Sequence, residues 1–220
     1  MLMKVKRRAG WICLCLVLVL MTGMLGGCRE HSEYPEATVS VPDTYAGYDV
    51  DPMHFRFEAG WTSANFDSVQ VQMDDMVLTL GINNNICIFY RLKSPVYDQG
   101  TVNYLDFGYL QMNHTMKAED LEGIMEQLDT LQSSIKRMEL SSTQLQASRI
   151  RCYGKNELEA LTFCYKISTS INDYTISCVE QVALIPWGTR LYVLIYSDFT
   201  TGGDSPALEE VLSTLTIDQP

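Results

Sequence analysis

Four strand-like segments near the end of the chain follow one another with very short connections, and they constrain the fold more than any other feature. The connections are "GKNE", "SIND" and "PWG", which consist mostly of residues that favour turns. Parallel strands need a crossover of about a dozen residues or more, so connections this short join antiparallel neighbours. The sequence therefore predicts an antiparallel meander, with strands at residues 144–153, 159–169, 174–185 and 189–197.

The same turns predict which residues face one another across the meander. If "GKNE" closes the first hairpin, Cys152 faces about residue 159, and if "SIND" closes the second, Cys164 faces about residue 181. Neither register places two cysteines opposite each other on neighbouring strands. Disulfides form in exported proteins, and two cysteines on non-neighbouring strands could still pair. We therefore expect buried free thiols, with disulfides as the alternative, at Cys87, Cys152, Cys164 and Cys178.

The first half of the domain also contains strand patterns. In "MHFRFEAGW", Phe55 and Phe57 alternate with polar residues, which indicates a strand. Three further strands are expected in "DSVQVQMDD", "MVLTLGI" and "ICIFYRLKS", with turns between them. Residues 95–115 look like a loop, to which "NYLDFGYLQM" could add a short strand or helix.

Two helices are expected. One has apolar residues at helical spacing, a possible N-cap at Thr115, and acidic residues near its positive end. The other lies in "PALEEVLSTL", where Ser205 can cap and Pro206 suits the first helical position. The apolar positions of the first helix are Leu121, Ile124, Leu128, Leu131, Ile135 and Met138.

Strands, helix, strands and helix in this order predict an α+β fold in a single domain at residues 53–220. We expect a mainly antiparallel β-sheet packed with a long central helix and a short C-terminal helix. "FRFEAGW", the helix before a four-strand meander, and the closing "LEEVLSTLTI" resemble the PsbP-like fold, which is also that of bacterial DcrB-type lipoproteins. The resemblance implies a non-catalytic accessory or binding module, often attached to a membrane.

The N-terminus has the layout of an export signal. The basic stretch "MKVKRR" precedes an apolar run at residues 9–25, and small residues follow. Leu25, Gly26, Gly27 and Cys28 resemble the lipobox of bacterial lipoproteins, in which the cysteine sulfur receives a diacylglyceryl group and the chain is cut just before it. An uncleaved transmembrane anchor, an ordinary secretory peptide and a structural cysteine are the alternatives.

The resemblance implies residues 1–27 as a signal peptide, and residues 28–52 as the lipidated cysteine with a flexible tether. The protein would then be held at a bacterial cell membrane, on its extracytoplasmic face, by acyl chains of the palmitate class. About 24 flexible residues would place the domain roughly 25–30 Å from the lipid.

Charge limits the partners. Lys4, Lys6, Arg7 and Arg8 precede the apolar run, which leaves 12 basic residues against 27 acidic ones from Cys28 onward. Nucleic acids and anionic phospholipids repel a surface with this excess of negative charge. We therefore expect no nucleic-acid partner, a lipid anchor in the membrane, and a protein partner at the membrane surface.

Few residues suggest chemistry. His31, His54 and His114 are isolated, and neither H-x-x-H nor C-x-x-C occurs, so no metal site or cofactor is expected. G-x-S-x-G is absent, and we do not expect an enzyme. The candidate ligand-binding residues are Trp61, Trp187 and Tyr192, although aromatic residues in a small domain usually belong to the core.

The sequence thus favours a lipid-anchored extracytoplasmic binding or accessory protein whose ligand is unknown. The alternatives are a small solute-binding lipoprotein, whose usual two-lobed form needs a longer chain, and an extracytoplasmic hydrolase without a recognisable motif. A polar cleft with His54 or His114 beside a serine or cysteine would favour the hydrolase.

Overall fold

A computed structural model describes residues 34–64, 68–73, 76–81, 87–97, 101–137, 143–154, 157–171, 174–200 and 206–218. Its helices are α2 (Ala118–Arg137) and α3 (Ala207–Thr214). Its strands are β1 (Ala46–Val50), β2 (Met53–Phe57), β3 (Thr62–Ser63), β4 (Ser68–Met73), β5 (Met76–Gly81), β6 (Cys87–Lys93), β7 (Tyr104–Gln111), β8 (Thr143–Tyr153), β9 (Leu158–Ile171), β10 (Tyr174–Trp187), β11 (Arg190–Asp198) and β12 (Thr216–Ile217).

Seven strands form the main sheet, in the order β3-β6-β7-β11-β10-β9-β8, and each neighbouring pair is antiparallel. The predicted meander is confirmed as β8 to β11. Its registers are confirmed as well, because Cys152 pairs with Glu159 and Cys164 with Gln181. The chain is therefore an α+β protein with a mainly antiparallel sheet and two described helices.

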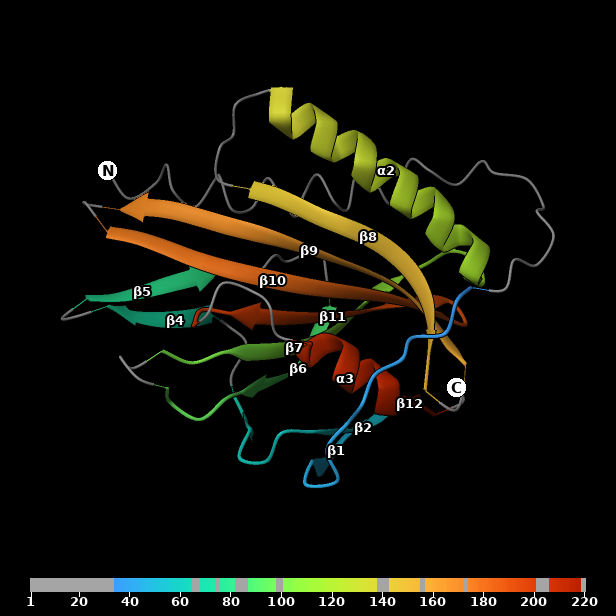
Figure 1. The fold of residues 1–220 in the computed structure, drawn as a ribbon, viewed down its shortest axis with the longest axis horizontal. Helices are drawn as coiled ribbons and strands as arrows, with labels where there is room; N and C mark the ends of the chain where they lie inside the picture. Colours follow the sequence, from blue (N-terminus) through green and yellow to red (C-terminus); the bar gives the residue numbers. More distant parts are fainter. Residues whose placement is uncertain are drawn as a thin grey trace.

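Helix α2 covers one face of this sheet. Alternate residues of β10 point to opposite faces, and Val182 and Leu184 belong to the apolar cluster that includes Leu121 and Leu128 of α2. The helix contacts β8, β9 and β10, at one side of the sheet (Figure 1). Helix α2 has 20 residues and lies mid-chain between β7 and β8, and its contacts fall on the β8 side of the sheet.

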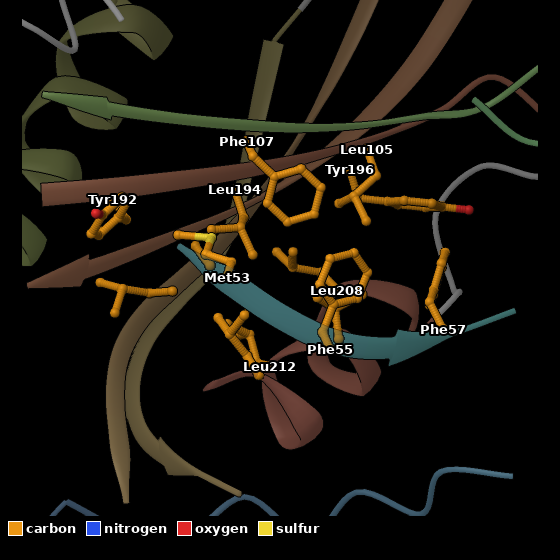
Figure 2. Close-up of a cluster of buried hydrophobic side chains, with 14 of the residues drawn as sticks. Met53, Phe55, Phe57, Leu105, Phe107, Tyr192, Leu194, Tyr196, Leu208 and Leu212 are labelled. Carbon is orange, nitrogen blue, oxygen red and sulfur yellow. The ribbon is translucent and has the colours of Figure 1, made fainter. Parts of the chain in front are cut away.

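The opposite face is covered by α3 and by a small sheet of order β1-β2-β12. Phe55 of β2 stacks on Phe107 of β7 with 5.1 Å between ring centroids. Leu208 and Leu212 of α3 lie in the same cluster (Figure 2). Both faces of the main sheet are therefore buried, which explains why its strands contain apolar residues at consecutive positions.

Strand β7 lies in a stretch expected to be loop-like, with a short strand or helix in "NYLDFGYLQM" as the alternative. The strand alternative is confirmed, because Tyr104–Gln111 is an eight-residue strand between β6 and β11. Asp106, a charged residue at its middle, obscured the pattern. Its carboxylate is only 5% exposed and accepts hydrogen bonds from the guanidinium of Arg91 on β6, which is 1% exposed. A buried ion pair thus occupies positions at which a strand usually carries apolar side chains.

The predicted flexible tether at residues 28–52 is wrong for residues 34–52. The Ala37 N–H donates to the carbonyl of Cys152 (2.8 Å), and the Cys152 N–H donates to the carbonyl of Pro35 (3.1 Å). Strand β1 then pairs with β2 along its whole length. This segment satisfies backbone groups at the end of β8 and at the edge of β2, so the domain begins at Tyr34 or earlier.

Helix α2 begins at Ala118, not beside Thr115. The Lys117 N–H donates to the Asp120 carboxylate (2.8 Å), so an acidic residue of the first turn satisfies a backbone group at the helix start. Pro206 precedes α3 and makes no side-chain cap. Ser205 and Met138 lie outside the described residues, as do His31 and the lipobox residues 25–28.

Candidate contact surface at one end of the sheet

The structure does not bring the three predicted aromatic candidates together. Trp61 is 5% exposed and contacts Phe57 and Tyr196 at one end of the main sheet. Tyr192 is 3% exposed and lies near the opposite end, where half-buried Trp187 closes β10. Trp61 and Tyr192 are therefore core residues, and Trp187 has the greatest exposure of the three.

Arg190 assembles a surface around Trp187 that the sequence alone did not reveal. It pairs with Trp187 across the turn between β10 and β11. Its guanidinium carbon lies 4.5 Å from the ring centroid of Tyr109, and its Nη1 donates to the hydroxyl of Tyr192 (3.3 Å). This hydrogen bond with Tyr192 is the main reason that the pKa of Arg190 is raised. The side chain is thus stacked and held, while it remains exposed.

Phe89 completes this group from β6. Its ring centroid lies 6.2 Å from that of Tyr109 and 6.4 Å from that of Tyr192. We refer to Phe89, Tyr109, Trp187 and Arg190, with Tyr192 beneath them, as the aromatic–arginine surface. It combines half-buried rings with one exposed cation, and such a combination suits contact with groups that are partly apolar and partly anionic.

A thiol lies at the border of this surface. Cys87 is exposed and pairs with Tyr109, and its hydrogen bond is the first cause of the raised pKa of Tyr109. All four described cysteines are free, as expected. The expectation that they are buried is wrong for Cys87, which begins β6, while Cys152 and Cys164 are half-buried and Cys178 is buried.

A histidine between two carboxylates lies next to Trp187. The backbone carbonyl of Asp218 accepts a hydrogen bond from the Nε1–H of Trp187 (3.3 Å). The carboxylate of Asp218 lies 3.1 Å from Nε2 of His54. Nδ1 of His54 lies 2.8 Å from the carboxylate of Asp49. The hydrogen bonds to Asp49, and then to Asp218, raise the pKa of His54. A doubly protonated ring satisfies both carboxylates at once.

We expect a proton titration of His54 by NMR to give a pKa above 6.5. Because the folded pKa is raised, the stability contributed by this proton is fully present below the unfolded pKa and is lost as pH rises through the folded value. Asp49→Asn should lower the pKa of His54, whereas Asp43→Asn, a matched change away from the ring, should not. An unchanged titration in Asp49→Asn would show that this hydrogen bond does not hold the proton.

The described residues include few other groups that could take part in chemistry. His114 contacts the Asn113 amide oxygen and the Asp120 carboxylate, so neither His54 nor His114 has a serine or cysteine as its hydrogen-bond partner. Within the described ranges, no group of histidine, cysteine or acidic side chains is arranged to hold a metal ion. No helix among these residues is both long and apolar enough to cross a bilayer.

Comparison with known proteins identifies no family. No family model matches the sequence, and no curated protein does. Cyanobacterial PsbP (CyanoP) from Synechocystis sp. PCC 6803 has a solved structure with 12% identity and a TM-score of 0.46, and the match covers 88% of this chain and 99% of that one. A crystal structure from Bacteroides thetaiotaomicron shares 10% identity with a TM-score of 0.36, and the match covers 76% of this chain but only 46% of that one.

Proposed function

We propose that this chain is a lipid-anchored, non-catalytic binding or accessory protein on the extracytoplasmic face of a bacterial membrane. The observation that carries the proposal is the run Leu25–Gly26–Gly27–Cys28, which follows a basic stretch and an apolar run. We further propose that the domain has a PsbP-like fold. The support is the order of its elements: β2 followed by Trp61, α2 before the meander, and α3 with β12 at the end.

The anchored domain would lie close to the membrane. The described structure begins at Tyr34, and only residues 29–33 separate it from Cys28. Six residues span at most about 20 Å when fully extended, whatever their conformation. The tether expected from the sequence was several times longer in residues. The protein would therefore work at the membrane surface itself, and we propose that it does so together with a protein partner there.

The lipid anchor is tested by metabolic labelling with a clickable palmitate analogue in a bacterial host. The full chain should become labelled and lose residues 1–27, because lipidation precedes cleavage at the cysteine. Cys28→Ala should remain unlabelled and keep the full length. Cys87→Ala is the matched control, since it removes an exposed cysteine of the domain and should leave labelling unchanged. Labelling that persists in Cys28→Ala would contradict the proposal.

A further inference from the structure

We propose that the aromatic–arginine surface rests on the headgroup layer of the membrane that anchors the chain, so that this end of the sheet is the lipid-facing end. The inference depends on the proposed lipidation of Cys28. It goes further, because it assigns an orientation to the domain and names lipid headgroups as what the surface contacts. It is carried by three observations: where the N-terminal segment is attached, how short the chain before it is, and what chemistry surrounds the attachment point.

The attachment point lies at the same end of the main sheet as the surface: Tyr34 packs on the face that α2 covers, and the rings of the surface pack on the opposite face. The Tyr34 hydroxyl donates to the carbonyl of Ala118 (3.4 Å), at the start of α2. Two residues earlier, the Met116 N–H donates to the carbonyl of Gly188 (2.7 Å), in the turn between Trp187 and Arg190. In Figure 1 the first described residues accordingly lie next to the start of α2, at the end of the sheet where β8 ends.

The short chain before Tyr34 then limits the orientation. Because Cys28 can be no more than about 20 Å from Tyr34, the acyl chains must enter the bilayer close to this end of the domain. The opposite end of β6, at Lys93, lies about 20 Å from Cys87, at about 3.3 Å per residue step. The loop with Val96, which is 71% exposed, follows that end and would face away from the membrane.

The chemistry of the surface fits a headgroup layer. Trp and Tyr prefer the polar–apolar boundary of membranes, since each has an apolar ring and a polar atom. The guanidinium of Arg190 uses Nη1 for Tyr192, which leaves donors of the same fork for a lipid phosphate. Trp187 donates to the backbone carbonyl of Asp218, whose carboxylate shares His54 with that of Asp49. The mature chain is also acidic, so we expect contact with zwitterionic rather than anionic lipid.

Tryptophan fluorescence tests the proposal on the lipidated mature chain, reconstituted in phosphatidylcholine vesicles with or without brominated acyl chains. After cleavage the chain has two tryptophans, and Trp61 is buried at the far end of the sheet. The emission of Trp187 is the difference between the native chain and Trp187→Phe. We expect brominated lipid to reduce this emission by about twofold, because Trp187 would lie at the polar–apolar boundary. The emission that remains in Trp187→Phe should not change.

A second measurement does not depend on a tryptophan variant. A nitroxide is attached to the exposed Cys87. Oxygen concentrates in lipid, so the label should be more accessible to oxygen when the lipidated chain is in vesicles than when the unlipidated chain is in buffer. The matched control is Val96→Cys in a Cys87→Ser background, which places the label at the far end and should show no such increase.

The outcomes separate the two proposals. Intact mass first establishes whether the reconstituted chain carries acyl groups, and an unmodified chain would overturn both the lipid anchor and the docking. An acylated chain without quenching at Trp187 and without an effect at Cys87 would overturn the docking alone. Quenching that appears only when bacterial membrane proteins are reconstituted into the same brominated vesicles, and is absent without them, would also overturn it, in favour of a protein partner at this surface.

Discussion

Replacing Asp106 by alanine is expected to lower the free energy of unfolding by about 3–5 kcal/mol, which is the usual cost of leaving one charge of a buried pair without its partner. Arg91 is 1% exposed and donates through Nε and Nη2 to this carboxylate. Its Nη1 has no hydrogen-bond partner in the described structure, although its guanidinium carbon lies 5.0 Å from the Tyr104 ring centroid. Burial raises the pKa of the Asp106 carboxyl, and the pair with Arg91 opposes that rise.

Chemical denaturation followed by tryptophan fluorescence measures this loss. The matched control is the double variant Arg91→Met/Asp106→Leu, which replaces the pair by apolar side chains and should recover most of the stability. A single variant with near-native stability, or a double variant as unstable as the single one, would contradict a buried, mutually dependent pair. Should the single variant fail to accumulate in folded form, recovery in the double variant still decides the question.

Replacing Phe107 by alanine is expected to cost about 3–5 kcal/mol, through lost burial and the cavity left behind. Its side chain is fully buried, and its ring joins the main sheet to β2 by stacking on Phe55 (Figure 2). The Tyr90 ring packs edge-on against it, with centroids 6.4 Å apart. The variant should therefore weaken the packing of the small sheet against β7, in addition to lowering the free energy of unfolding of the whole domain.

Denaturation measures the total loss, and hydrogen exchange of the β2 amides measures the local effect. Val96→Ala is the control, because it removes apolar atoms from a side chain that is 71% exposed and should change stability by about 0.5 kcal/mol or less. A loss below about 1 kcal/mol in Phe107→Ala would mean that this face of the main sheet is not buried as the structure has it.

The meander was predictable in detail because short turns leave little freedom of register. The facing positions of Cys152 and Cys164 followed from the lengths of "GKNE" and "SIND" alone, and both are correct. Strand β1 was not predictable in the same way. Its five residues, "AGYDV", include a glycine and a charged aspartate and show no clear alternation, so only pairing with β2 defines it as a strand.

The candidate surface was predictable only in part. Trp187 could be found because it ends β10 beside a turn, but Tyr192 lies on the inward-facing side of β11 and belongs to the core. Tyr109 and Arg190 are far apart in sequence, and only the antiparallel pairing of β7 with β11 brings their side chains together. No local pattern in the sequence encodes that contact. The available signal was confined to Arg190, which begins β11 just after the "PWG" turn.

The short distance between Cys28 and Tyr34 connects the anchor with the fold. Only five residues separate the two, so in the proposed lipidated chain the anchor would also set the orientation of the domain. If Cys28 carried no lipid, the aromatic–arginine surface would still exist, but the proposed lipid anchor would not hold it at a membrane.

Intact mass of the protein extracted from bacterial membranes is the most direct test of the lipid anchor. We expect a chain that begins at Cys28, lacks residues 1–27, and carries the additional mass of a diacylglyceryl group on its first residue. Fragmentation should place that mass on Cys28 rather than on exposed Cys87. A chain of 220 residues without added mass, or a cleaved chain with an unmodified Cys28, would contradict the account.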